Sequence, residues 1–198
     1  MSLLIKQLMK QQVGHRFFSL LLAGCLMLSV TWLQAAEFTV RDAQTRLLDG
    51  VYHLEADIRY QLSDPIHEAL ANGVPITISL QVVIEQQRDY IWNKTLAHLQ
   101  QHYSVQYHAL SGQYIIKDLN RGRQQSFRSL NSALQTLGEI RELPLLDQSL
   151  LKEPDAVYQV RLRSEIDINS LPAPLRPKAW LSHEWKLKSE WFLCPLSS

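Results

Sequence analysis

Three histidines lie close enough in the sequence to suggest a metal site. His98 and His102 are four residues apart, so on a helix both imidazoles could face one Zn²⁺, and His108 could add a third ligand from the next strand. No acidic residue flanks the pair to orient the rings, as ligating histidines usually require. We interpret these residues as solvated histidines, and the sequence predicts neither a metal nor any other cofactor.

Three acidic residues, Asp155, Glu165 and Asp167, could supply a carboxylate pair for acid–base catalysis. Glu165 and Asp167 are two positions apart on the polar side of an expected strand, so both side chains are expected in water. Catalytic carboxyl groups instead lie in clefts that perturb them. The pattern therefore favours an ordinary solvated strand face.

A third group contains Arg121, Arg123 and Arg128, around an expected turn and helix start. Their guanidinium groups could bind an anionic headgroup or the carboxylates of a partner. The whole chain has 20 Lys and Arg against 19 Asp and Glu, and no acidic residue precedes Glu37, so the chain after residue 36 is slightly acidic. A solvated face is favoured, and the charge balance predicts no nucleic-acid partner.

The C-terminal region is rich in tryptophan and proline. Trp185 and Trp191 share strand parity with apolar neighbours and are predicted core residues. Prolines 172, 174 and 177 are expected to hold residues 171–180 extended, so that Leu175, Arg176 and Trp180 project from a stiff backbone. Because Arg and Trp are enriched at binding hot spots, these three are the predicted partner-binding residues. The alternative is a crossover between sheets with Leu175 packed inside.

No sequence motif indicates an enzyme. The chain lacks a Gly-rich phosphate loop, G-x-S-x-G, H-E-x-x-H and C-x-x-C, which weighs against NTPases, α/β-hydrolases, zincins and thioredoxin-like proteins. We expect a non-catalytic binding module. The alternative is an enzyme or small-ligand carrier with a cleft that no motif reveals.

Residues 1–36 are typical of an export signal, because basic residues precede an uncharged apolar run. Ala35 and Ala36 favour cleavage near Glu37, and a mature 37–198 domain in the periplasm is expected. Two alternatives stay open. Lipidation at Cys25 would fit the lipobox-like 22–25, and retention of 17–33 would make an inner-membrane anchor. After the signal only Cys194 remains, and we expect it to be buried.

Period-two alternation predicts most of the elements that position these residues. Residues 38–48 and 52–62 should pair through the Asp49-Gly50 turn. A short helix should follow, with Asp64 as N-cap, and then a strand over 74–85 whose hairpin partner contains Tyr90-Ile91-Trp92.

Farther along the chain the same pattern predicts strands at 103–110, 113–119, 158–168 and 185–193. A helix with Ser126 as N-cap should end at Gly138, and 139–156 should be a loose connection. The expected fold class is all-β, an antiparallel immunoglobulin-like β-sandwich with two short helices in a single domain over 37–198. A closed barrel is the alternative.

Several segments resemble one exported proteobacterial family, the domain-of-unknown-function family numbered 4390. They are residues 70–76, 88–92, 103–107, 130–134, 171–176 and 185–191, in order and at plausible spacing. The resemblance implies a signal sequence and an envelope location. Genes of the family are often found beside a membrane sensor histidine kinase, which implies an envelope-signalling partner, and the resemblance implies no reaction.

Overall fold

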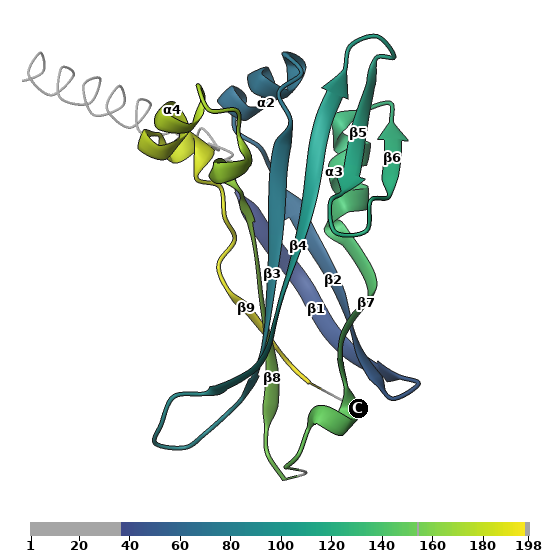
Figure 1. The fold of residues 1–198 in the computed structure, drawn as a ribbon, viewed down its shortest axis with the longest axis vertical. Helices are drawn as coiled ribbons and strands as arrows, with labels where there is room; N and C mark the ends of the chain where they lie inside the picture. The colour runs from purple at the N-terminus through teal and green to yellow at the C-terminus, as the bar shows by residue number, and fades with distance from the viewer. Residues whose placement is uncertain (1–36, 154, 197–198) are drawn as a thin grey trace, which may run out of the picture. The chain divides into compact units, whose positions relative to one another are not determined.

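The protein folds into two antiparallel β-sheets that pack around an apolar core (Figure 1). The computed structural model describes residues 37–153 and 155–196. The segment expected to be an export signal, residues 1–36 with Cys25, therefore lies outside the described residues. One sheet has the strand order β1-β2-β7 and the other β6-β5-β4-β3-β8-β9. The expectation of a mainly β protein with antiparallel sheets is confirmed.

The described elements follow in chain order. The strands are β1 (Phe38–Leu48), β2 (Val51–Tyr60), β3 (Ile76–Gln86), β4 (Lys94–His108), β5 (Gln113–Asp118), β6 (Gln124–Phe127), β7 (Glu139–Asp147), β8 (Tyr158–Ile166) and β9 (Phe192–Pro195). The helices are α2 (Asp64–Ala71), α3 (Leu130–Gly138) and α4 (Arg176–Leu181), with short 3₁₀ turns η1 (Gln148–Leu150), η2 (Ile168–Ser170) and η3 (His183–Trp185).

The first hairpin forms as the sequence predicts. Asp49 and Gly50 have φ angles of 49° and 79°, so both occupy the left-handed region that a two-residue hairpin turn requires. Alternate residues of β2, from Tyr52 to Tyr60, are buried. In the second sheet, β3 lies between β4 and β8, and its predicted core residues Ile78 and Leu80 are each 1% exposed.

The hairpin after β3 differs from the prediction. Tyr90-Ile91-Trp92 lies in the connecting loop, because the β3–β4 ladder ends at the pair Gln86 and Lys94. Tyr90 has a φ of 69°, which a strand cannot accommodate. Strand β4 then continues without a break through the predicted 103–110 segment to His108.

Helix boundaries also differ. The side chain of Ser129, not Ser126, caps α3 by accepting a hydrogen bond from the Ser132 N–H, and Ser126 lies in β6. Ser63 rather than Asp64 precedes α2. The segment expected to be a loose connection contains β7, which pairs with β2.

The prolines were expected to hold residues 171–180 extended. This expectation was wrong, because part of the segment is helical. Residues 176–181 form α4, a third helix among the described residues, with Pro177 in its first turn. Proline is tolerated there because the first helical N–H groups have no intrahelical acceptor.

The last strand is also shorter than predicted. Ser189 interrupts it: its N–H donates to the Ser164 carbonyl at 2.8 Å and its Oγ accepts from the Ser164 N–H at 3.0 Å. Strand β9 therefore begins only at Phe192.

Candidate functional site: a cleft beside Trp180

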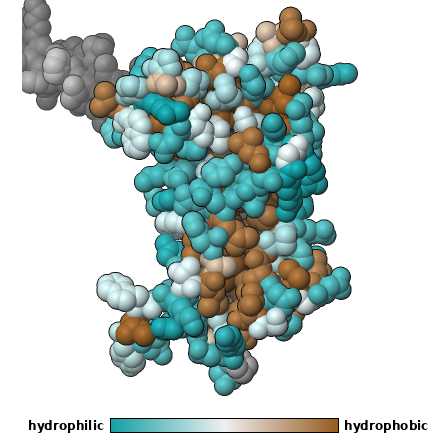
Figure 2. All heavy atoms as spheres, in the orientation of Figure 1, coloured by the Kyte–Doolittle hydropathy of each residue, from teal (hydrophilic) through white to brown (hydrophobic). Residues whose placement is uncertain are grey.

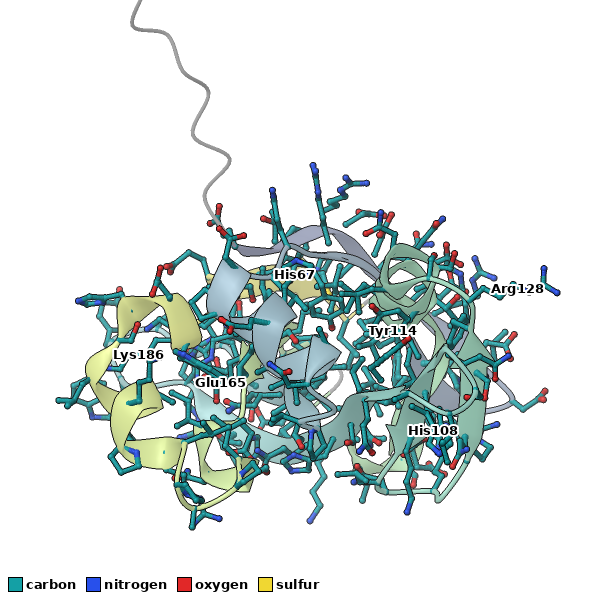
Figure 3. All side chains as sticks on the ribbon, turned by 90° about the horizontal axis from the view of Figure 1, so that it is seen from above. His67, His108, Tyr114, Arg128, Glu165 and Lys186 are labelled. Atoms are coloured by element: carbon teal, nitrogen blue, oxygen red, sulfur yellow. The ribbon has the colours of Figure 1, made fainter. Side chains whose placement is uncertain are left out.

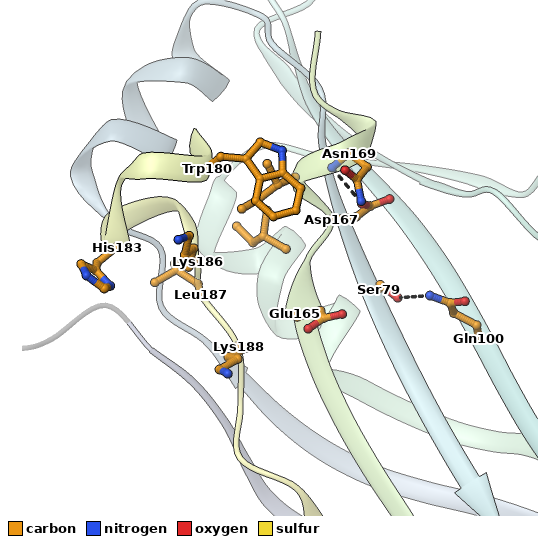
Figure 4. Close-up of a pocket in the computed structure, with 12 residues that line it drawn as sticks. Ser79, Gln100, Glu165, Asp167, Asn169, Trp180, His183, Lys186, Leu187 and Lys188 are labelled. Carbon is orange, nitrogen blue, oxygen red and sulfur yellow. Dashed lines mark hydrogen bonds between the residues drawn. The ribbon is translucent and has the colours of Figure 1, made fainter. Parts of the chain in front are cut away.

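A cleft of about 720 Å³ opens between the outer face of the larger sheet and the C-terminal helical segment (Figure 4). We call it the Trp180 cleft. Strands β3, β4 and β8 contribute Ser79, Gln100 and Glu165, and the segment from η2 to Lys188 forms the other wall. Such a volume falls within the range of about 300–1,000 Å³ typical of ligand sites.

Buried residues form the floor of the cleft. Ser79 is 1% exposed, and its Oγ accepts a hydrogen bond from Gln100 Nε2 at 3.1 Å. Ile166 and Leu187 are buried apolar residues, and the Ile166 N–H donates a hydrogen bond to the Leu187 carbonyl at 2.9 Å. This bond fixes the wall segment to β8, so the cleft is held open by the fold itself.

Two carboxylates line one side. Glu165 Oε1 accepts a hydrogen bond from Gln81 Nε2 at 2.7 Å, and Glu165 Oε2 lies 3.5 Å from Arg163 Nη2. Asp167 accepts hydrogen bonds from the Asn169 N–H at 3.0 Å and from the Ser170 hydroxyl. Both carboxylates therefore already have partners that fix their orientation.

The opposite side carries an aromatic ring and cations. Trp180 is 53% exposed and faces the cleft from α4, while Lys186, Lys188 and His183 are exposed around it (Figure 4). Helix α4 is anchored by Ala179, which is completely buried.

The next turn, η3, is held by a residue far away in the sequence that lies at the same end of the domain (Figure 1). Ser63 Oγ, which lies just before α2, donates a hydrogen bond to the Glu184 carbonyl at 2.7 Å. The wall of the cleft therefore rests on two independent attachments.

The arrangement is suited to recognition of a polar ligand. An exposed indole offers a flat apolar surface, and ammonium, carboxylate and carboxamide groups around it can pair with charged or amide groups. Because Glu165 and Asp167 are held by hydrogen bonds on a strand and a turn, they can present acceptor oxygens to a bound donor.

The three predicted partner-binding residues do not lie together in one site. Only Trp180 lines the cleft. Leu175 is half-buried, and Arg176 is exposed but donates from its Nε to the Leu171 carbonyl at 2.7 Å, which closes the turn before α4.

The other two tryptophans have different surroundings. Trp185 is 3% exposed, as predicted for a core residue. Trp191 is half-buried on the sheet surface, where the guanidinium groups of Arg161 and Arg163 lie 4.7 and 4.5 Å from its ring centroid.

The remaining candidates do not form a site with the cleft. His98 and His102 lie on one strand, roughly 13 Å apart at the usual rise per residue, so they cannot share a metal ion. His108 and Arg128 lie on the side of the molecule away from Glu165 and Lys186 (Figure 3). Among the described residues, no group of three His, Cys, Asp or Glu side chains could hold a metal ion.

Two of the three arginines do meet at a smaller depression of about 250 Å³. Arg121 and Arg123 line it together with Arg141 of the strand that follows α3, and all three are exposed. Arg128 is not among the residues that line it. Asp155 is exposed in the turn before β8 and lies apart from the Trp180 cleft.

Cys194 is buried, as predicted, with 5% of its surface exposed. Burial, and to a smaller extent the negative charge of Asp42, raises the pKa of its thiol to about 11. The thiol is therefore not activated for nucleophilic chemistry.

Sequence reasoning identified Trp180, Glu165 and Asp167 separately but did not bring them together. It missed Lys186 and Lys188, because the 185–193 segment was expected to be a regular strand, and it missed His183, because no feature of the sequence predicted the 3₁₀ turn η3. The alternation of charged and apolar residues in 186–190 was visible, but nothing local shows that this segment faces another wall across a cleft.

Comparison with known proteins gives one match. The sequence model of a family described as "Domain of unknown function (DUF4390)" matches residues 35–194. No curated protein and no solved structure matches the chain. Among the residues that the structure describes, no helix has the length and apolar character needed to cross a membrane.

Proposed function

The chain belongs to the DUF4390 family, whose function is unknown, and we propose that it is a non-catalytic interaction module of the cell envelope. The module binds a segment of a partner protein in the Trp180 cleft. The family resemblance suggests a membrane sensor kinase as the partner class.

One observation carries this proposal: the cleft combines an exposed indole, two carboxylates held by hydrogen bonds and two exposed lysines over a buried floor. A polypeptide segment presents amide groups, charges and apolar side chains together, so each type of group in the cleft finds a counterpart. A backbone N–H can donate to Glu165 or Asp167, and an acidic side chain can pair with Lys186 or Lys188.

The proposed location follows from the sequence. The basic and apolar layout of residues 1–36 favours export to the periplasm, with cleavage near Glu37, and retention as an inner-membrane anchor is the alternative. The finer assignment to an immunoglobulin-like sandwich is part of the same proposal, because such sandwiches commonly serve as cell-surface interaction domains.

The test compares two single substitutions on α4. Leu181 is 86% exposed and does not line the cleft, so Leu181→Ala is a matched control for Trp180→Ala. After crosslinking in cells and purification of the tagged full chain, we expect the partner to be lost from Trp180→Ala and kept by Leu181→Ala. Partner recovery that is equal for the two variants would contradict the proposal.

A second candidate function is a small-ligand carrier, which the cleft volume of about 720 Å³ favours. Mass spectrometry of the purified protein under native conditions separates the two. A carrier would retain a small molecule that Trp180→Ala releases, whereas an interaction module would show the mass of the chain alone.

A further inference from the structure

The loop between β3 and β4 presents three large apolar side chains to solvent at its end. Tyr90 is fully exposed, Trp92 is 92% exposed and Ile91 is 61% exposed. We call these three residues the aromatic tip. Figure 2 shows the loop projecting at the lower left, away from the body of the protein. Large apolar residues that gather at a projecting surface usually mark an interaction site.

The base of this loop is fixed, although its end is free. The Gln87 N–H donates to the Val157 carbonyl at 2.8 Å, and Gln86 Nε2 donates to Glu153 Oε2 at 2.6 Å. On the other side, Asn93 Nδ2 donates to Glu85 Oε2 at 3.2 Å. Hydrogen bonds therefore hold both ends of the loop, and the tip is presented from a rigid support.

The backbone within the tip is also specialised. Tyr90 has a φ of 69°, in the left-handed region that a bulky side chain rarely adopts. This turn aims the aromatic rings outward instead of folding them onto β4. Residues in such conformations gather at ligand-binding and switch regions. A prearranged tip loses little conformational entropy on docking.

Surrounding charges indicate what kind of surface the tip meets. Three basic residues and three acidic residues lie in the loop or beside it: Arg88, Lys94, Lys152, Asp89, Glu153 and Asp155. Electrostatic attraction to an anionic lipid surface comes from an excess of Lys and Arg, which this balanced set does not provide. Trp, Tyr and Arg are instead the residue types that dominate protein–protein hot spots.

The position of the tip separates it from the Trp180 cleft. Ser79 lines the cleft and Gln86 is the last residue of β3 before the loop, and these two residues, seven positions apart along the strand, are separated by roughly 23 Å. Helix α4, which contributes Trp180 to the cleft, lies at the end of the molecule opposite to the β3–β4 loop (Figure 1). The tip is therefore too far from the cleft to take part in the same local contact.

We propose that the aromatic tip is a second docking surface, which inserts Trp92 and Ile91 into an apolar pocket of a protein other than a copy of this chain. The domain then contacts proteins at both ends of the larger sheet. The inference rests on the proposed function only in taking the partner to be a protein.

The experiment places a photo-crosslinking residue at Ile91 in the full chain and illuminates living cells. We expect one adduct with a distinct protein, which is lost from Trp92→Ala and kept by Trp180→Ala. Purified partner should then bind Trp92→Ala at least tenfold more weakly than it binds the original chain. Because Trp92 is almost entirely exposed, the variant should fold normally, and circular dichroism checks this.

Three results would overturn the inference. One is the absence of any adduct from Ile91. Another is flotation of the protein with vesicles of phosphatidylethanolamine and phosphatidylglycerol that Trp92→Ala abolishes, which would assign the tip to a membrane. The third is a dimer in sedimentation that Trp92→Ala dissociates, which would assign it to a second copy. Loss of binding at the cleft in Trp180→Ala tests the proposed function separately.

Discussion

Trp191 lies within cation–π distance of two guanidinium groups on the outer face of the larger sheet, those of Arg161 and Arg163. Arg161 also lies 3.1 Å from Glu85, and Arg163 donates from Nη2 to Gln81 Oε1 at 3.1 Å. The two guanidinium groups are therefore fixed by acceptors on β3 while their faces cover the indole. A cation over an aromatic ring contributes about 0.5–1 kcal/mol at an exposed site and more when water is excluded.

Replacing Trp191 should therefore destabilise the fold although the ring is not in the core. We expect Trp191→Ala to lower the free energy of unfolding by roughly 2–3 kcal/mol, from lost apolar contact and two lost cation–π contacts. Urea unfolding followed by circular dichroism measures this. Trp92→Ala is the control, because Trp92 is 92% exposed and should change stability by less than about 0.5 kcal/mol. Equal effects of the two substitutions would show that the contacts of Trp191 with the two arginines contribute nothing to the free energy of unfolding.

Helix α3 approaches β2 so closely that only glycine fits at its last residue. A Cβ added to Gly138 would lie 1.9 Å from the Ile58 carbonyl oxygen, which is backbone and cannot move aside. The sequence predicted only that the helix ends at Gly138. The structure shows why glycine is needed there, which is the close contact between helix and sheet.

Gly138→Ala should consequently separate α3 from the sheet. We expect a loss of at least about 3 kcal/mol in unfolding free energy, at the upper end of overpacking effects. Gly112→Ala provides the comparison, because Gly112 has a φ of 63° but open space around its Cβ. Its cost should be about 1 kcal/mol, from backbone strain alone. Similar losses for both variants in the same unfolding experiment would contradict the close approach.

One side of the support of the aromatic tip rests on the carboxylate of Glu85, which accepts a hydrogen bond from Asn93. Burial alone would raise the pKa of Glu85, but hydrogen bonds from Asn93 and Gln159 and the charge of Arg161 outweigh it, so the pKa lies below its ordinary value of 4.5. A carboxyl whose pKa is lowered by folding stabilises the protein above its unfolded pKa. That contribution disappears as the pH falls through the lowered value.

Glu85→Gln should thus flatten the acid dependence of stability. The original chain should lose unfolding free energy as the pH falls below 4.5, and Glu85→Gln should lose less over the same interval. Urea midpoints measured at several pH values between 3 and 7 give the comparison. If both proteins follow the same pH curve, the contacts of Glu85 do not stabilise the folded state.

For the whole molecule, alternation of apolar residues was enough to predict sheets but not the places where strands stop. The Asp49-Gly50 hairpin and the buried Ile78 and Leu80 follow from local pattern. The interruption at Ser189 depends on Ser164, which is distant in the sequence. The Ser164 N–H bonds to the side chain of Ser189, and the Ser164 carbonyl accepts from the Ser189 N–H. No window of sequence contains both residues, so no periodicity could show the interruption.

The candidate site could not be predicted for the same reason, because its residues are far apart in the sequence. Glu165 and Lys188 are 23 positions apart but pair across an isolated bridge, and Trp180 reaches them only because 176–181 forms a helix. Proline content correctly marked the segment as unusual, but Pro177 in a first helical turn allows helix where extended chain was expected. The site is therefore a product of tertiary packing.

Docking of a partner protein in the Trp180 cleft can be tested by photo-crosslinking in cells from single, chosen positions of the chain. A crosslinking residue at Lys186 lies in the cleft, and one at Arg128 lies on the other side of the molecule (Figure 3). If a partner docks in the Trp180 cleft, the residue at Lys186 gives a single protein adduct that is lost on adding Trp180→Ala, and the residue at Arg128 gives none. Equal adducts from both positions, or an adduct from Arg128 alone, would contradict it.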